Sequence, residues 1–121
     1  MAELLRTDKD ISFAVNILTK KEDGMFTAHC LELDIVAVSD TLENVQKEIV
    51  SLICAQIDYA FSNDNLENLY HPAPPEAWHE LYKCKEQIER KYAIRSDKTF
   101  EKVPPWLITK TCNSNKNIHY A

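Results

Sequence analysis

The chain has 121 residues, of which 45% are hydrophobic and 27% are charged, and its formal net charge at pH 7 is −5. This composition is typical of a globular chain with one modest core, and it excludes a disordered protein and a membrane protein. An acidic chain repels phosphate backbones, so nucleic-acid binding by the whole surface is disfavoured, whereas the charge would suit a basic protein partner.

The first half of the chain reads as three strands. Residues 11–18, ISFAVNIL, alternate with a period of two, which predicts a strand with one apolar face. Asp23-Gly24 is the signal of a type I′ hairpin turn, so a second, antiparallel strand is expected at about residues 25–31. The β-branched run at residues 34–38 predicts a third strand after another tight connection.

A long helix is expected next, beginning after Asp40 and running to about Ser62. Asp40 and Glu43 match a capping box, with Asp40 as the N-cap. The apolar residues cover an arc of roughly 200°, more than the ~100° that one side of a sheet needs. We therefore expect the helix to be buried on more than one side, against another helix or a second subunit.

The second half of the chain predicts a second helix and a last strand. A proline loop precedes Pro75, which suits the first residue of a helix at about residues 75–92. WLITKTC, residues 106–112, reads as a last strand that lies beside the first. The element order is β-β-β-α-α-β, which predicts an α+β fold with a three- to four-stranded, mainly antiparallel sheet and the long helix packed on it. We expect a single domain over residues 1–121, with the proline loop and second helix at about 63–92 as an addition.

The four cysteines are not spaced like a metal site. Cys30, Cys54, Cys84 and Cys112 show no CxxC or CxxH pattern, so a structural zinc site is disfavoured. The N-terminal sequence lacks the apolar region of a signal peptide, so we expect a cytoplasmic protein. Four reduced and mostly buried thiols follow from that expectation.

The stretch AHCLELDIVAVSDT, residues 28–41, contains residue types that are common in active sites. Neighbours in a strand point to opposite faces, so His29 and Cys30 cannot form a hydrogen-bonded catalytic pair. Ala28 and Cys30 are expected in the core. Glu32 and Asp34 are expected as polar residues of the turn before the third strand. His29 faces away from the helix and has no structural role in this interpretation.

The longer stretch GMFTAHCLELDIVAVSDTLENVQKEIVSLI resembles the HicB-type antitoxin domain over residues of about 11–60. The matching residues are Ala28, Cys30, Glu32, Leu33, Asp40, Thr41 and Glu43. Ser39 replaces the glycine that is usual before the "dT" pair, and residues after about 63 do not resemble a DNA-binding module. The resemblance implies a partial ribonuclease-H-like topology and a role in binding a small basic toxin, a ribonuclease, and masking its active site.

A ribonuclease-H-like topology also raises the alternative of a metal-dependent nuclease. Such an enzyme needs clustered carboxylates around two divalent ions, and Glu32, Asp34, Asp40 and Glu43 are close in sequence. The first strand, however, has no carboxylate within its apolar run. We therefore rank this alternative third and predict no catalytic, cofactor-binding or metal-binding residue.

The expected function is that of a non-enzymatic, HicB-like antitoxin domain with a small basic protein as its partner. Contact with the partner or a subunit is predicted at His29, Tyr70 and Trp78, because aromatic residues are enriched at interfaces. The simpler interpretation of Trp78 is that it packs on the long helix. We expect a homodimer or larger oligomer without direct DNA binding or a cofactor. The second-ranked role is a stand-alone homo-oligomeric scaffold or small-ligand-binding domain.

Overall fold

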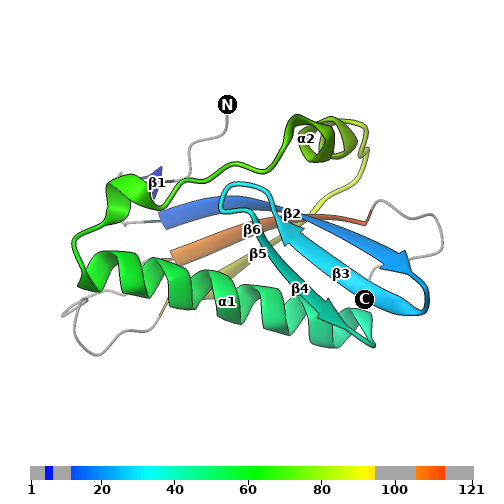
Figure 1. The fold of residues 1–121 in the computed structure, drawn as a ribbon, viewed down its shortest axis with the longest axis horizontal. Coiled ribbons are helices and arrows are strands. Elements are labelled where there is room, and N and C mark those ends of the chain that lie inside the picture. The colour runs from blue at the N-terminus through cyan, green and yellow to red at the C-terminus, as the bar shows by residue number, and fades with distance from the viewer. Residues whose placement is uncertain (1–4, 7–11, 95–105, 114–121) are drawn as a thin grey trace.

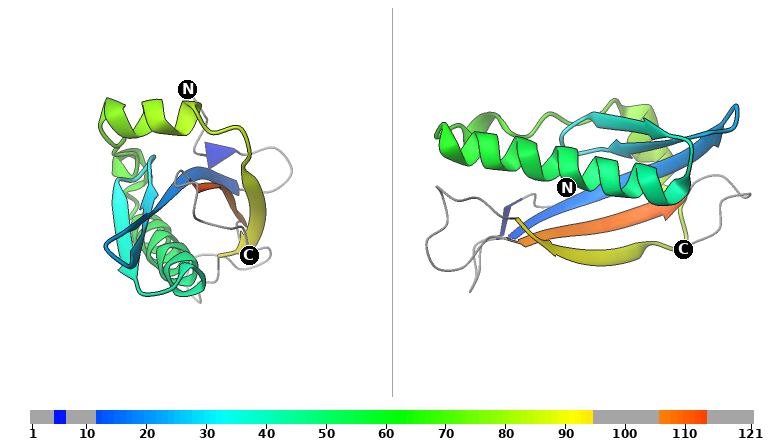
Figure 2. Two further views of the ribbon diagram at one scale, coloured as in Figure 1. Left: turned by 90° about the vertical axis from the view of Figure 1, so that its right-hand side faces the viewer. Right: turned by 90° about the horizontal axis from the view of Figure 1, so that it is seen from below.

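The computed structural model describes residues 5–6, 12–94 and 106–113, and these form one curved sheet with a helix on each face (Figure 1, Figure 2). The strands are β1 (Leu5–Arg6), β2 (Ser12–Glu22), β3 (Met25–Cys30), β4 (Ile35–Ser39), β5 (Ile88–Ala93) and β6 (Trp106–Asn113). The helices are α1 (Leu42–Ser62), the short 3₁₀ helix η1 (Leu66–Asn68) and α2 (Pro75–Tyr82). The sheet therefore separates two helical layers, with α1 on one face and α2 on the other.

The sheet has the strand order β4-β3-β2-β6-β5, and β1 pairs with the start of β2. β2, β3 and β4 form the antiparallel meander that the first three strand-like runs predict. β6 lies beside β2, as expected for the last strand, and runs parallel to it. The α+β class is confirmed, but the predicted number of strands was too low, because β1 and β5 were not predicted.

The second half of the predicted second helix is a strand. α2 ends at Tyr82, and residues 88–93 form β5, which pairs antiparallel with β6 at the edge of the sheet. Ile88, Arg90 and Tyr92 line a cavity under α1. The alternation of these residues with Glu89 and Lys91 has the period of a strand. Residues 88–93 therefore form a strand because they pair with β6, although their charged residues are also common in helices.

Both tight connections of the meander have backbone angles that few residue types adopt. Asp23 and Gly24 have φ angles of 52° and 78°, and the flanking residues Glu22 and Met25 pair directly. Positive φ at both positions is the geometry of a type I′ turn, so the predicted hairpin is confirmed. Asp34, which precedes β4, has a φ of 53°. Aspartate tolerates this left-handed conformation better than most residues.

The long helix begins one residue later than the predicted capping box requires. The N-cap is Thr41, whose Oγ1 accepts a hydrogen bond from the backbone N–H of Asn44 at 3.1 Å. The prediction of Asp40 as N-cap was wrong. Glu43, one turn before Lys47, forms an ion pair with it at 3.3 Å. The start of α1 thus depends on a threonine hydroxyl.

The larger core cluster lies between α1 and the sheet. The buried residues of the helix repeat at three- to four-residue spacing (Val45, Ile49, Ile53, Ile57 and Ala60). α2 lies on the other face of the sheet and does not cover α1. Leu52 and Tyr59 are consequently 40% and 63% exposed. The second buried side that the wide apolar arc predicts is not provided by the described part of the chain.

The smaller core cluster lies under α2. Its buried members are Leu18, Leu31, Ala73, Leu81 and Cys112, and Trp78 packs against them. Trp78 therefore does not pack on the long helix, which was its simpler interpretation. Cys84 and Cys112 form a disulfide between the end of α2 and β6. The prediction of four reduced thiols was wrong for this pair, while Cys30 and Cys54 are free.

The cap of α1 can be tested by substitution. Thr41→Ala removes the acceptor for the N–H of Asn44, and we expect it to lower the free energy of unfolding by about 1 kcal/mol. Asp40→Ala is the matched control, and we expect a change within about 0.5 kcal/mol. Urea denaturation of both variants measures the difference. A larger loss for Asp40→Ala would restore the capping box as first predicted.

The disulfide can be tested in the same way. It joins residues 28 positions apart, so its loss should lower the free energy of unfolding by about 3–4 kcal/mol in the chain-entropy model. We expect Cys84→Ser, or a reducing agent, to shift the urea midpoint downward. Cys54→Ser serves as the control because Cys54 is a free thiol. An unchanged midpoint under reducing conditions would contradict the disulfide.

Candidate functional site

A buried carboxylate lies at the turn between β3 and β4. Glu32 is fully buried, and its two oxygens accept hydrogen bonds from the backbone N–H and the side-chain Nδ2 of Asn16, each at 2.7 Å. The backbone N–H of Leu31 donates to the carbonyl of Asn16 at 2.9 Å. The ladder between β2 and β3 ends at Ile17 and Cys30. Glu32 thus provides a hydrogen-bond acceptor for the backbone N–H of Asn16, at the point where β2 no longer pairs with β3.

Burial raises the pKa of Glu32, and the hydrogen bonds from Asn16 act in the opposite direction. A carboxylate in this position costs free energy through desolvation unless donors compensate it. The structural role of Glu32 is therefore larger than that of the solvated turn residue that the sequence predicts.

The proline loop is attached to this same turn. The backbone N–H groups of His71 and Ala73 donate to the carbonyls of Glu32 and Leu31 at 2.9 and 2.8 Å. The indole Nε1 of Trp78 donates to the carbonyl of Ala73 at 3.1 Å. These bonds hold the loop before α2 against the β3–β4 turn.

A groove of about 400 Å³ opens on the outer side of this loop and α2. Its walls are aromatic and proline residues together with one histidine and one alanine (Tyr70, Pro72, Ala73, Pro75, Trp78, His79 and Tyr82). The rings of Trp78 and Tyr82 are 6.4 Å apart, and Tyr82 is 73% exposed. Burial, followed by the charges of Glu32 and Tyr82, raises the pKa of Tyr70. We call this surface the aromatic groove.

The structure brings two of the three predicted contact residues together. Tyr70 and Trp78 both line the aromatic groove, whereas His29 lies on β3 and is not among the residues that line it. His29 Nε2 lies 2.6 Å from Oδ1 of Asp34. His29 therefore has a structural partner, and the interpretation that it has no structural role was wrong. Because it is paired with Val36 in the β3–β4 ladder, it lies beside β4.

Charges are unevenly distributed along the chain. Residues 22–82 contain twelve acidic residues and one basic residue, Lys47, whereas residues 83–121 contain nine basic and four acidic residues. Residues 63–82, which supply the aromatic groove, contain four acidic residues and no lysine or arginine. One of them, Glu80, is paired with Lys20 at 2.7 Å. The groove therefore lies in the acidic part of the chain.

The free cysteines do not have the environment of a nucleophile. Cys30 is fully buried in the α1-facing core, as predicted together with Ala28. Burial, together with the charge of Glu32, raises the pKa of Cys30 to about 12. Burial also raises the pKa of Cys54. A reactive cysteine needs the opposite shift, because the thiolate is the reactive form.

The four acidic residues of the nuclease hypothesis each have a different partner, and that of Asp40 is the hydroxyl of Ser39 at 3.4 Å. Glu32 binds Asn16, Asp34 binds His29, and Glu43 binds Lys47. Among the described residues, no group of three or more His, Cys, Asp or Glu side chains is placed to hold a metal ion. The structure gives no site around which two-metal chemistry could be built within that part of the chain.

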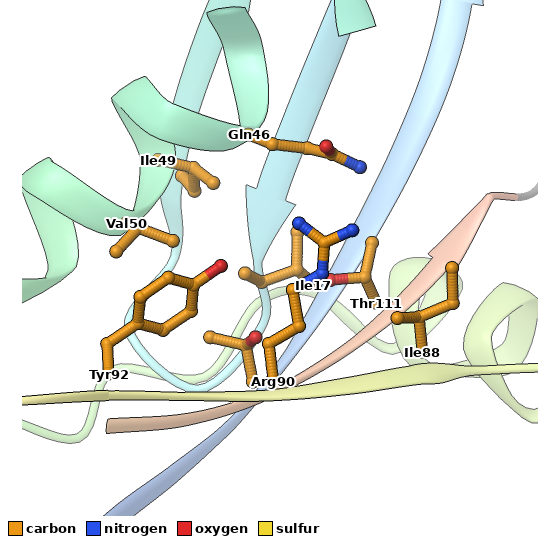
Figure 3. Close-up of a pocket in the computed structure, with 9 residues that line it drawn as sticks. Ile17, Gln46, Ile49, Val50, Ile88, Arg90, Tyr92 and Thr111 are labelled. Atoms are coloured by element: carbon orange, nitrogen blue, oxygen red, sulfur yellow. The ribbon is translucent and has the colours of Figure 1, made fainter. Parts of the chain in front are cut away.

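A narrow cavity lies between α1 and strands β5 and β6 (Figure 3). Gln46 from α1 and Arg90 from β5 extend into it, with Ile49 and Ile88 among its apolar walls (Figure 3). Its volume is about 10 Å³, which is room for about one water molecule. This cavity is too small for a metabolite. The shallower hollow beside it, of about 450 Å³, has Glu43 and Lys47 at its rim, already paired with each other.

Comparisons of the chain with protein-family models, with curated proteins and with solved structures each returned no match. Among the described residues, no helix has both the length and the apolar character required to span a membrane.

The sequence interpretation missed Tyr82 and His79 as members of the groove. Trp78 and Tyr82 are four residues apart, which places them on one side of α2. The sequence contains that spacing, but a helix that continues to residue 92 gives no reason for Tyr82 to stand at a helix end beside a loop. The role of Glu32 had no local signal, because its partner Asn16 is 16 positions away.

The buried carboxylate predicts a pH-dependent stability. Because the pKa of Glu32 is raised on folding, its contribution is fully present below the unfolded-state value, near 4.5, and is lost as the pH rises through the folded-state pKa. We expect Glu32→Gln, which stays neutral, to remove this decline. The exposed Glu48→Gln is the control and should keep it. Urea midpoints of the three proteins between pH 4 and pH 8 measure the effect, and parallel profiles for the native chain and Glu32→Gln would contradict it.

Proposed function

We propose that this chain is a non-enzymatic interaction domain, similar in role to HicB-type antitoxins, that binds a small basic protein and masks it. The observation that carries the proposal is the aromatic groove, which exposes Tyr82 at the end of an acidic stretch, residues 63–82, that has no lysine or arginine. Aromatic side chains on a rigid support are the residues that contribute most to binding energy at interfaces. Acidic surroundings attract a basic partner and select against acidic ones.

The topology supports the partial ribonuclease-H-like arrangement within this proposal. An antiparallel meander, β2-β3-β4, is followed by α1, and β6 returns beside β2. This order resembles the ββ(β)αβ order that the resemblance implies, but β1 precedes it and α2 and β5 come before the last strand. Binding would mask the partner by steric cover from the α2 side of the sheet. The partner in this proposal is a toxin ribonuclease.

Homo-oligomer formation is the second candidate role. Leu52 and Tyr59 remain exposed on α1, seven residues apart and therefore on one face of the helix. Such a stripe is suited to contact with a second copy of the chain. This surface lies on the opposite side of the sheet from the aromatic groove, so the two roles can be tested separately.

Two exposed tyrosines provide the matched test of the proposed function. Tyr82→Ala removes a groove residue and Tyr59→Ala removes an α1 residue of similar exposure, 73% against 63%. The partner to use is a small basic protein that co-purifies with the tagged chain, with binding measured by titration calorimetry and masking measured by its RNA cleavage rate. We expect Tyr82→Ala to raise Kd about tenfold or more and to release cleavage, because an interface tyrosine contributes on the order of 2 kcal/mol.

Tyr59→Ala should leave both readouts unchanged, and affinity should fall with added salt because the attraction is between charges. Equal losses for the two variants would place the contact elsewhere. No complex with the basic protein would overturn the proposed function itself.

A further inference from the structure

The edge strand β4 lacks the charged residues and proline that commonly protect a sheet edge. β4 reads Ile-Val-Ala-Val-Ser, with no charged residue and no proline, and no strand among the described residues pairs with its outer side. The opposite edge strand, β5, carries Glu89, Arg90 and Lys91. Charged side chains on an edge prevent pairing with other chains. The two edges of the sheet therefore differ, and β4 is the one open to another strand.

The exposed side of β4 is apolar. Val36 and Val38 are 53% and 50% exposed, and they lie beside His29 and Thr27 of β3 on the face opposite to α1. Ala37, which points to the other face, is buried under α1. On this face, the side chains of a strand paired with β4 would thus lie beside Val36 and Val38, which are two positions apart.

Carboxylates lie at both ends of this apolar row. Asp34 and Asp40 precede and follow β4, and both are exposed. The contact of Asp34 with His29 shows that its side chain lies on the same face as Val36. The two aspartates are six residues apart and flank the extended segment of β4. A fully extended chain of this length spans about 20 Å, and the left-handed backbone of Asp34 makes the separation shorter.

This charge pattern disfavours pairing of β4 with a second copy of itself. In a symmetric antiparallel pair centred on Ala37, Asp34 of each copy would lie opposite Asp40 of the other. Like charges directly opposite one another destabilise a pair of strands. A register shifted to avoid this would place each aspartate that remains within the paired segment opposite a valine. The edge is therefore suited to a different strand.

We propose that the edge of β4 binds an extended segment of a basic protein by strand addition. The segment would have two apolar residues opposite Val36 and Val38 and a lysine or arginine opposite each of Asp34 and Asp40. Backbone hydrogen bonds supply binding in this mode, and the alternating side chains supply selectivity. The required spacing, with cations six residues apart, is the same for parallel and antiparallel addition. This surface does not include the aromatic groove, so the inference does not depend on the proposed function.

A synthetic peptide, acetyl-Lys-Thr-Val-Thr-Val-Thr-Lys-amide, is the probe. Backbone amide NMR should show saturable shifts at residues 35–39, together with slower hydrogen exchange there. The same peptide with glutamate in place of both lysines should bind on the order of tenfold more weakly. Asp34→Asn combined with Asp40→Asn should weaken the lysine peptide on the order of fivefold and remove most of the salt dependence.

Glu48→Gln combined with Glu67→Gln removes the same charge from exposed positions elsewhere and should leave the affinity unchanged. Asparagine at position 34 tolerates positive φ and keeps an oxygen for His29, so the fold should be retained. The proposal is overturned by equal binding of the acidic peptide, by shifts confined to residues 70–82, or by no saturable binding at millimolar peptide. Protection of residues 35–39 in a dimer of the free chain would also overturn it. Tyr82→Ala should bind the peptide normally, which separates this test from that of the aromatic groove.

Discussion

The placement of the aromatic groove depends on one buried carboxylate. β3 separates from β2 after Cys30, and the edge of β2 beyond that point would have an unsatisfied backbone N–H at Asn16. Glu32 supplies the acceptor, and the backbone carbonyls of residues 31 and 32 then accept hydrogen bonds from the proline loop. The same four-residue turn thus ends a strand pairing and positions the loop that carries Tyr70. An unsatisfied buried donor costs about 1–3 kcal/mol, which is large relative to the stability of a small domain.

The parts of the fold that sequence reasoning predicted correctly are those with local signals. Asp23-Gly24 adopts the positive φ angles that a type I′ turn requires, so this pair predicts the hairpin. The alternation in ISFAVNIL has the period of a strand, and it predicts the strand that pairs with β6. The helix at 42–62 followed from its apolar periodicity. The predicted N-cap, Asp40, is one residue too early. Aspartate and threonine are both favoured at N-cap positions, so residue type alone does not tell which of Asp40 and Thr41 caps the helix.

The elements that could not be predicted depend on distant partners. Residues 88–93 have the charged composition of a helix, and they form a strand because they pair with β6, whose residues are 13 to 23 positions away in the sequence. Cys84 and Cys112 come together only when α2 crosses the sheet onto the face opposite to α1. Tyr70 and Trp78 were predicted as contact residues from composition. Their position in one groove results from hydrogen bonds between the proline loop and the β3–β4 turn, which no local pattern reveals.

The two proposed docking surfaces share a charge preference but use different physics. The aromatic groove offers rings and prolines on a helix and a fixed loop, which suits side-chain burial. The β4 edge offers backbone groups and two valines, which suits an extended strand. Both lie in the part of the chain with twelve acidic residues and one lysine. The acidic charge of this part of the chain would attract a basic protein before either surface makes specific contacts.

We propose that a small basic protein binds in the aromatic groove. Hydrogen exchange of the backbone amides, measured with and without the bound basic protein, tests it most directly. We expect slower exchange in residues 69–82, including the amides of His71 and Ala73 that already donate to the β3–β4 turn. Protection confined to β5 and β6, with residues 69–82 unchanged, would contradict it.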